Sequence, residues 1–367
     1  MADGKKMDLI PASEWGLFTN FHPMVIAGPC SAESEEQVLE TAKELASFGI
    51  QVFRAGIWKP RTHPGCFEGV GAKGLPWLRQ ARMQYGVKIC TEVAGARHVQ
   101  ECLRHGIDLV WIGARTTANP FLVQEIADAL QGTELPVLVK NPINSDLDLW
   151  IGALERLQRA GVRKLGVIHR GFSSLQTGPY RYTPGWRIAV ELRTRYPELP
   201  FFADPSHMAG DRKYVPELSQ RALDLGLDGL MIESHCHPEQ ALSDAAQQLS
   251  PQALRHLLNE QLTVREADTE EPSYRENIEQ LRARIDILDE NLLELLRSRM
   301  AVSKEIGRFK KEHNIAILQT PRWDALLDDM IRKGDAEGLN ETFLRSLFSA
   351  IHEESIRVQN DVLSEKE

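Results

Sequence analysis

The stretch Met24-Val-Ile-Ala-Gly-Pro-Cys-Ser-Ala-Glu-Ser34 joins a short apolar run to a polar segment. The run Met24–Ala27 is continuously apolar, as a strand buried on both faces should be. The polar residues from Gly28 onward end this strand, and a helical stretch comes next. The stretch therefore predicts one βα unit, with its polar residues at the carboxyl end of the strand.

Seven further runs of the same kind follow before residue 250, and helical stretches separate them. They are Gln51–Arg54, Val87–Thr91, Leu109–Ile112, Val137–Lys140, Leu165–His169, Phe201–Asp204 and Leu230–Glu233. Eight βα units in about 250 residues predict the α/β class and a (β/α)8 TIM barrel. The competing architecture is an open doubly wound sheet, but no GxGxxG follows the first run to support it.

The composition excludes several classes of protein. The chain has 367 residues, 42% hydrophobic and 26% charged, with a net charge of −9, which is typical of a folded globular protein. No global positive field exists for nucleic acid or an anionic membrane surface, so we expect neither as a partner. No apolar run is long enough for a membrane span, and the start MADGKKMDLI lacks a secretory signal, so we expect a cytoplasmic protein. The five cysteines lack CxxC spacing, which argues against disulfides or a structural zinc site but leaves metal binding by one of them open.

A change in composition near residue 266 marks a second domain. The stretch Glu266-Ala-Asp-Thr-Glu-Glu-Pro272 is acidic, and apolar residues then recur at alternating spacings of three and four. These stripe residues are Ile278, Leu281, Ile285, Leu288, Leu292, Leu295, Val302, Ile306 and Phe309. So long an amphipathic helix must pack on later helices, at about Pro321–Lys333 and Asn340–Gln359, and on a second copy of itself. We therefore expect a barrel over residues 1–262, a linker over 263–274 and an all-α dimerising domain over 275–367.

Polar side chains follow nearly every apolar run, where a TIM barrel places its chemistry. Five of them are cations, namely Arg54, Lys59, Arg115, Lys140 and Arg170. Each one alone would be interpreted as a solvated loop charge. Five at equivalent strand ends would repel one another unless anions bind among them. The pattern therefore predicts phosphate and carboxylate ligands.

Four other side chains of the strand ends have the donor types of a metal site. Cys30, His207, Glu233 and Asp244 offer a thiolate, an imidazole and two carboxylates, a set suited to Mn, Fe, Co or Zn acting as a Lewis acid. Taken singly, Cys30 would be a packed small hydrophobe and His207 a hydrogen-bonded loop histidine. The prediction of a metal site therefore depends on the four residues converging.

The order of these motifs resembles a known enzyme family. AGPCSAES, RAGIWKPRT, TEV, GARTT, VKN, HRG, DPSH and ESH, over about residues 24–245, resemble the short type I-beta 3-deoxy-D-arabino-heptulosonate 7-phosphate (DAHP) synthases. The resemblance implies a metal-dependent TIM barrel that condenses phosphoenolpyruvate with erythrose 4-phosphate, the entry to the shikimate pathway. It also implies that the four ligand-type residues hold the metal, with manganese our first expectation. The five cations then bind phosphoenolpyruvate.

Within this resemblance, the segment Lys59-Pro60-Arg61-Thr62 indicates the aldehyde. The related 3-deoxy-octulosonate 8-phosphate synthases carry Lys-Ala-Asn-Arg there and use arabinose 5-phosphate, so we expect this segment to select erythrose 4-phosphate. We expect Lys59 to give a proton to the new alkoxide and Glu92 to orient the attacking water. His63 stands where many relatives carry serine, and its role is open.

Three cations lie on or beside the apolar stripe of the long helix. Arg299 takes a stripe position that should be apolar, and Arg282 and Lys310 each follow a stripe residue directly. A buried arginine is costly unless it meets an anion. Arg282 and Lys310 lie about 40 Å apart on one helix, so they serve one small ligand only if two copies pack antiparallel. The alternative is a plain dimerisation coiled coil with a polar residue that sets its register.

Residues 275–360 resemble the all-helical chorismate mutases. The matching features are LRxxIDxLDxxLLxLLxxR, a Lys eleven residues after its last Arg, and a terminal Ser-x-x-x-Gln. By motif position, the resemblance implies a metal-free chorismate site of Arg282 from the partner chain, Arg299, Lys310, Arg322, Ser355 and Gln359. In such a site the arginines fix the reactive conformer, and the Lys–Gln pair stabilises charge on the ether oxygen. Trp323 and Gln319 depart from the family, which usually has a substrate-contacting Glu at the first position and an acidic residue at the second.

Together the two resemblances predict a bifunctional shikimate-pathway enzyme that is at least a homodimer through its helices, with a higher oligomer left open. Our hypothesis for the fusion is feedback, in which chorismate or prephenate bound at the helical domain inhibits the synthase. The rival interpretation is a synthase whose helical domain is only a regulatory or dimerisation module.

Overall fold

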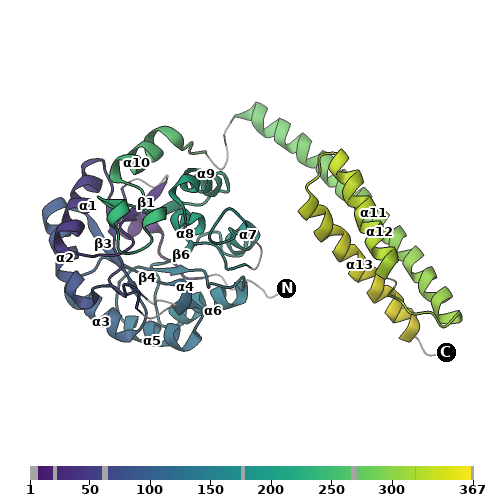
Figure 1. The fold of residues 1–367 in the computed structure, drawn as a ribbon, viewed down its shortest axis with the longest axis horizontal. Helices are drawn as coiled ribbons and strands as arrows, with labels where there is room; N and C mark the ends of the chain where they lie inside the picture. Colours follow the sequence, from purple (N-terminus) through teal and green to yellow (C-terminus); the bar gives the residue numbers. More distant parts are fainter. Residues whose placement is uncertain are drawn as a thin grey trace. The chain divides into compact units, whose positions relative to one another are not determined.

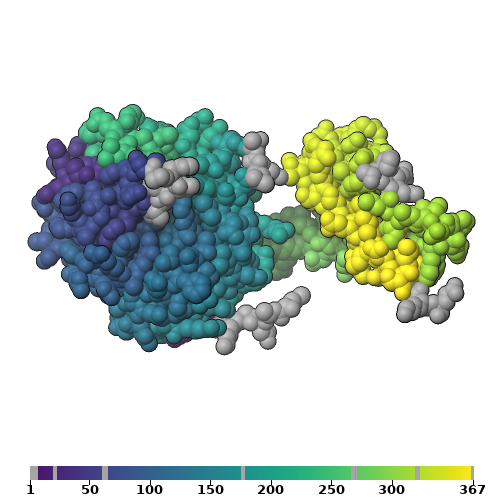
Figure 2. Space-filling model, turned by 60° about the horizontal axis from the view of Figure 1, so that its bottom comes forward, coloured from purple at the N-terminus to yellow at the C-terminus, as the bar shows by residue number. Residues whose placement is uncertain are grey.

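The computed structural model describes residues 7–19, 23–59, 65–174, 178–265, 269, 271–318 and 320–364, the side chains of residues 320–322 excepted. Its contacts divide the chain into two compact units, Met1–Ala267 and Asp268–Glu367. Figure 1 shows the ribbon of each unit and Figure 2 its surface. The predicted bounds of the linker, residues 263–274, stay a prediction.

The first unit is a closed barrel of eight parallel strands, in which each strand pairs with the next and β8 pairs with β1. The strands are β1 (Met24–Gly28), β2 (Val52–Arg54), β3 (Lys88–Val93), β4 (Leu109–Ile112), β5 (Val137–Lys140), β6 (Leu165–His169), β7 (Phe201–Ala203) and β8 (Gly229–Glu233). The predicted TIM barrel is confirmed, and the open-sheet alternative is wrong because β1 and β8 are hydrogen-bonded to each other.

Helices surround this barrel, as Figure 1 shows. They are α1 (Glu35–Ser47), α2 (Gly74–Tyr85), α3 (Ala96–His105), α4 (Ala114–Thr117), α5 (Pro120–Leu130), α6 (Leu147–Arg159), α7 (Trp186–Arg195), α8 (Pro205–Ala209), α9 (Val215–Asp224) and α10 (Pro251–His256). The short helical turns are η1 (Ala12–Glu14), η2 (Gly71–Lys73), η3 (Arg212–Tyr214), η4 (Pro238–Gln240), η5 (Ala245–Gln247) and η6 (Leu257–Gln261).

Apolar side chains fill the inside of the barrel as well as the layer between strands and helices. The inner group takes one or two residues from each strand, for example Ile26, Trp111 and Met231. Trp15, Leu17 and Phe18, from the segment before β1, belong to this same inner group. Because that group also contains Met24, the first residue of β1, the N-terminal segment closes the N-terminal end of the barrel. The open end is therefore the mouth, where the strands finish.

A glycine lets the first two strands meet closely at the mouth. Gly28 ends β1 with φ +148°, and a Cβ at this position would lie 2.1 Å from the carbonyl oxygen of Arg54 at the end of β2. Any other residue would clash with that backbone atom. This close approach brings the loop that carries Cys30 against Arg54.

The second unit consists of the helices α11 (Pro272–Glu312), α12 (Thr320–Ala336) and α13 (Glu341–Ser364), which confirms the predicted helical region. Gly307 of α11 lets α13 approach, because a Cβ there would lie 3.2 Å from the Cα of Gln359. The apolar stripe of α11 is largely exposed in the single chain, with Leu288 at 64% and Phe309 at 66%. The predicted dimerisation stays a prediction. Among the described residues, no helix is long and apolar enough to cross a bilayer.

Candidate functional site

The four predicted metal ligands meet at the mouth of the barrel. One ligand atom each from Cys30, Glu233 and Asp244 lies within 4.8 Å of the other two, and the Cys30 Sγ lies 3.3 Å from Asp244 Oδ2. His207, on α8, brings its Nε2 to 3.6 Å from Glu233 Oε1. Two loops, α8 and the end of β8 therefore bring a thiol, an imidazole and two carboxylates to one place.

The pKa values at this cluster follow from burial and from neighbouring charge. Burial raises the pKa of the Cys30 thiol to about 12, and the Glu233 carboxylate adds to the effect. Burial would raise the pKa of Glu233 and Asp244 as well, but the charge of a protonated His207 and nearby arginines keeps both values below their usual range. Burial also lowers the pKa of His207, with help from Lys140. The imidazole and the carboxylates are thus ready to bind a cation, whereas the thiol must lose a proton.

These residues fit a divalent metal ion. Glu233 Oε1 is buried and accepts no well-aligned hydrogen bond in the described part of the chain, and a buried polar atom left in this state is costly. Its neighbours are the guanidinium of Arg54 at 3.3 Å and the imidazole of His207. A mixed sulfur, nitrogen and oxygen set suits ions of borderline softness. The donor chemistry and the unsatisfied oxygen both support a metal here.

Two of the predicted cations surround the indole of Trp111, which lies on β4. The guanidinium carbon of Arg54 lies 4.8 Å from the ring centroid, and Lys140 Nζ lies 5.8 Å from it. Arg54 is 1% exposed, and its Nε and Nη1 have no hydrogen-bond partner among the described residues. Lys140 donates a 2.6 Å hydrogen bond to Asp204. A buried arginine with unused donors indicates an anionic ligand.

Lys59 and Glu92 each contact a residue of the barrel mouth. Lys59 Nζ donates to the sulfur of Cys30 at 3.1 Å. Glu92, near the end of β3, accepts a 3.1 Å hydrogen bond from Trp111 Nε1. The structure therefore places the predicted proton donor beside the metal cluster and the predicted water-orienting carboxylate beside the indole that also contacts Arg54.

Arg170 and Arg115 lie farther along the mouth, around Tyr182. Arg170 is buried with its guanidinium carbon 3.5 Å from the centroid of that ring. Burial raises the pKa of Tyr182, but the charge of Arg170, with those of Arg181 and Arg115, lowers it below its usual value. Arg115 itself is exposed at the start of α4. Arg170 and Arg181 therefore both lie over the Tyr182 ring, the guanidinium carbon of Arg181 at 5.6 Å from its centroid.

Several contacts of the site were missed in the sequence. Arg181 forms a 2.8 Å ion pair with Asp244, Gln247 donates at 2.7 Å to Glu233, and Asp204 lies 2.7 Å from His207 Nδ1. Asp204 follows an apolar run, so its place at a strand end was a usable signal. Arg181 belongs to the connection between β6 and α7, whose unusual length was the only sign of a functional loop.

The predicted erythrose phosphate segment, Pro60, Arg61 and Thr62, lies outside the described residues, as does His63. Their expected roles stay predictions.

The helical unit brings three of its predicted residues together between α11 and α13. Arg299 donates to the hydroxyl of Ser355, which in turn donates to the carbonyl of Ile351 at 2.8 Å. Gln359, one turn beyond Ser355, is 8% exposed, and its Oε1 accepts no hydrogen bond among the described residues. Lys310, on the same helix as Arg299, donates to the carbonyl of Ile317. Arg299 and Ser355 therefore meet across α11 and α13, and the buried Gln359 lies one turn farther along α13, against Gly307 of α11.

The remaining mutase residues are not joined to this group within one chain. Arg282 is exposed on α11, and 17 residues of helix, roughly 26 Å, separate it from Arg299. Arg322 is on α12, and its side chain lies outside the described residues.

Trp323 stacks on His352 with ring centroids 4.0 Å apart. Burial, then the charges of Arg299 and Lys310, lower the pKa of His352, so this stacked pair borders the same group of cations.

Family models match both units. Residues 19–268 match the DAHP synthetase I family, and residues 281–360 match chorismate mutase type II.

Individual relatives agree with the first match. A phospho-2-dehydro-3-deoxyheptonate aldolase of Thermotoga maritima is 34% identical over 243 residues, which cover 66% of this chain and 70% of the relative. A 2-dehydro-3-deoxyphosphooctonate aldolase of Wolinella succinogenes is 26% identical over 274 residues, 66% of this chain and 99% of the relative. The crystal structure of a T. maritima phospho-2-dehydro-3-deoxyheptonate aldolase (DAHP synthase) superposes with a TM-score of 0.62 at 31% identity, covering 70% of this chain and 72% of that one.

Proposed function

Because the chain belongs to the DAHP synthetase I family and carries a chorismate mutase type II domain, we propose that it catalyses one reaction in each unit. The barrel condenses phosphoenolpyruvate with erythrose 4-phosphate, and the helical unit rearranges chorismate to prephenate. The observation that carries the proposal is the convergence of Cys30, Glu233 and Asp244 beside the buried cations Arg54 and Lys140.

In the barrel, buried cations hold phosphoenolpyruvate. Arg54 has unused donors for a carboxylate or phosphate, and Lys140 and Arg170 are 4% exposed each, where a charge interacts strongly with an anion. Lys59 and Arg115 complete the clamp at more accessible positions. The indole of Trp111, which both Arg54 and Lys140 lie over, supplies a rigid wall, so the substrate's anionic groups are bound in fixed directions.

A divalent ion held by Cys30, His207, Glu233 and Asp244 supplies Lewis-acid polarisation of the aldehyde. Manganese is our first choice, with iron, cobalt and zinc as alternatives, because the mixed donor set suits all four. Lys59 lies 3.1 Å from the Cys30 sulfur, where it can give a proton to the oxygen that becomes an alkoxide. Glu92, fixed by Trp111 Nε1, orients the water that adds to phosphoenolpyruvate.

In the helical unit, Arg299 and Ser355 bind one end of chorismate, and Lys310 and Gln359 stabilise charge on the ether oxygen. Gln359 is 8% exposed, and its side-chain Nε2–H is the group that would donate to the ether oxygen. Arg322 and Arg282 of the partner subunit complete the site. Two copies packed antiparallel along α11 would bring that Arg282 toward Arg299 and Lys310.

Two matched variants test the proposal, because each removes one activity and leaves the other as its folding control. We expect His207→Ala to lower the synthase rate at least about 100-fold and to leave chorismate consumption unchanged. Arg299→Ala should lower chorismate consumption roughly 100-fold or more and leave the synthase unchanged. A His207→Ala protein with a normal synthase rate would remove the metal assignment, and an unmodified chain that consumes no chorismate would favour the regulatory alternative for the helical unit.

We further propose that the mutase ligand regulates the synthase. Chorismate or prephenate bound at Arg299 would stabilise one of two conformations of the dimer. It can shift the equilibrium between an active and an inactive barrel only by as much as its affinity differs between these two conformations. Prephenate should lower the synthase rate of the full chain but not that of Arg299→Ala. An unchanged rate in the full chain at saturating prephenate would refute the regulation and leave both activities standing.

A further inference from the structure

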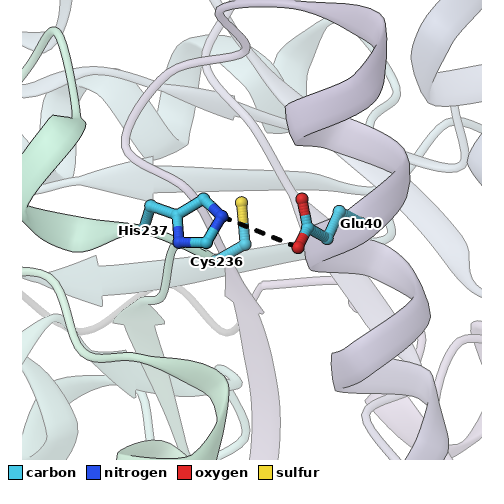
Figure 3. A group of neighbouring side chains, drawn as sticks. All are labelled: Glu40, Cys236 and His237. Carbon is cyan, nitrogen blue, oxygen red and sulfur yellow. Dashed lines mark ion pairs between the residues drawn. The ribbon is translucent and has the colours of Figure 1, made fainter.

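A second group of metal-ligand side chains lies apart from the first. One ligand atom each of Glu40, Cys236 and His237 lies within 4.8 Å of the other two, and His237 Nε2 is 3.7 Å from Glu40 Oε1. Figure 3 shows the carboxylate, the thiol and the imidazole turned toward one another, with Glu40 projecting from α1. None of the three takes part in the reactions proposed above.

The backbone holds this group in place from both sides. On α1, Gln37, Glu40 and Thr41 share one face, because residues three and four apart are neighbours on a helix. The segment after β8 lies against this face, since the Cys236 N–H donates to the Thr41 hydroxyl at 3.2 Å. The His237 N–H donates at 2.8 Å to Nδ1 of His235, which fixes the turn from which the two side chains project.

The separations match those of a metal site. Two ligands of a tetrahedral zinc ion, each about 2.0–2.3 Å from it, lie roughly 3.3–3.6 Å apart. The His237–Glu40 distance of 3.7 Å is already close to this value. The Cys236 sulfur lies within 4.8 Å of a ligand atom of each of the other two residues. Its printed hydrogen-bond contacts are long, 3.8 Å to His235 Nδ1 and 3.9 Å to the Gln37 carbonyl, and hold it weakly.

An exposed histidine–carboxylate ion pair contributes little to stability and would leave the third member of the group unexplained. A thiolate and a carboxylate together neutralise a divalent cation, and an imidazole adds the neutral donor that zinc commonly takes. Three protein ligands leave a fourth position for water. From this geometry we propose that Glu40, Cys236 and His237 bind a second divalent ion of borderline softness, with zinc preferred.

The position of this site gives it a role distinct from catalysis. Cys236 and His237 lie in the segment between Glu233 and Asp244, which are two of the ligands proposed at the barrel mouth. An ion shared with Glu40 fastens this segment to α1. The ion bound by Glu40, Cys236 and His237 therefore has a structural role, because it stabilises the segment that carries ligands of the ion proposed at the barrel mouth.

Cobalt(II) is the probe that tests the site, because a cobalt–thiolate bond absorbs in the near ultraviolet whereas zinc is colourless. Metal-stripped full-length Cys30→Ala protein, which lacks the thiol of the barrel mouth, should bind cobalt and show this band. Adding Cys236→Ala should abolish the band, and adding Cys66→Ala instead, at an exposed thiol, should leave it intact. The proposal fails if the Cys30→Ala protein shows no band at millimolar cobalt, or if the band survives the loss of Cys236.

Equilibrium dialysis with zinc provides a second measurement. Glu40→Gln and His237→Asn, at side chains 43% and 56% exposed, should fold normally and weaken binding of one of two zinc ions by more than about tenfold. Two ions retained at full affinity in both variants would overturn the proposal. If only the barrel-mouth assignment were wrong, the unmodified chain would bind a single ion that depends on Cys236, so the two failures are distinguishable.

Discussion

Among single residues, Cys30 joins the most parts of the barrel site. Its thiol contacts Lys59 and Asp244, its carbonyl accepts from Arg54 at 3.1 Å, and its N–H donates to Gln248 at 2.9 Å. Because burial raises the pKa of this thiol to about 12, the thiol is protonated at neutral pH when no ion is bound. Metal binding must therefore release the thiol proton.

This proton release predicts that metal affinity depends on pH. The pKa values of His207, Glu233 and Asp244 are all lowered, so near neutral pH only the thiol still holds a proton that the ion must displace. The affinity of the Cys236→Ala protein for Mn²⁺ should rise about tenfold per pH unit between about pH 6 and pH 8. Calorimetry in buffers of different ionisation enthalpy should count one proton released per ion. Adding Cys30→Ala should remove the slope, and a slope unchanged by that substitution would show that another group titrates.

The residues that the sequence did not reveal are those whose role depends on a neighbour far along the chain. Trp111 has the apolar character of any residue of a buried strand, yet both Arg54 and Lys140 lie over its ring. Glu40 reads as an exposed residue of α1 until the structure brings Cys236 and His237 beside it. The position of Cys30, His207 and Glu233 at strand ends can be recognised from the neighbouring sequence alone. Contacts between residues far apart in the sequence cannot be recognised in this way.

Among the elements, α11 is the one that a single chain leaves incomplete. Only Ser303 and Gly307 are buried among its described residues, although its stripe is apolar throughout. A stripe of this length exposed to water is typical of a helix that pairs with another protein surface. The antiparallel copy needed by the proposed chorismate site would cover it.

We therefore expect Leu292→Lys to dissociate the dimer. Each copy would lose the burial of one leucine, about 1.5–3 kcal/mol, and a symmetric interface loses it twice, so the dissociation constant should rise at least about 100-fold. Analytical ultracentrifugation measures this change, and chorismate consumption should fall with it. Glu290→Lys, at a position off the stripe, is the matched control and should remain dimeric. Leu292→Lys that sediments as the unmodified protein does would refute α11 as the interface.

The strands could be predicted well because the apolar run that indicates each strand covers the same residues as the strand. A strand buried on both faces must be continuously apolar, so Leu109–Ile112, Val137–Lys140 and Leu165–His169 carry the bounds predicted for them. The start of α11 was less clear, because the apolar spacing begins at Ile278 whereas the helix begins at Pro272. A proline is favoured in the first helical turn. The first turn of α11 lacks the apolar spacing, however, so the spacing alone could not indicate where the helix begins.

At the scale of the whole molecule, two units with different chemical requirements share one chain. The barrel gathers metal-ligand side chains at Cys30, Glu233 and Asp244. The site proposed for the helical unit uses Arg299, Ser355 and Gln359, which offer hydrogen bonds and charge but no thiol, imidazole or carboxylate. The two activities should therefore respond differently to the removal of metal.

Chelation of the full chain is expected to separate the activities. Dialysis against a strong chelator should reduce the synthase rate to background, because the aldehyde loses its Lewis acid, and Mn²⁺ should restore it. The mutase rate, followed by chorismate absorbance in the same samples, should change by less than about twofold, since its catalysis rests on hydrogen bonds and fixed charges. A synthase that keeps its rate after complete removal of metal would contradict the proposed role of the barrel cluster.

The segment before β1 limits where reactants can enter the barrel and where products can leave it. Trp15, Leu17 and Phe18 pack into the interior from the N-terminal end, so their side chains close this end of the barrel. Both reactants must enter, and both products must leave, by the same rim.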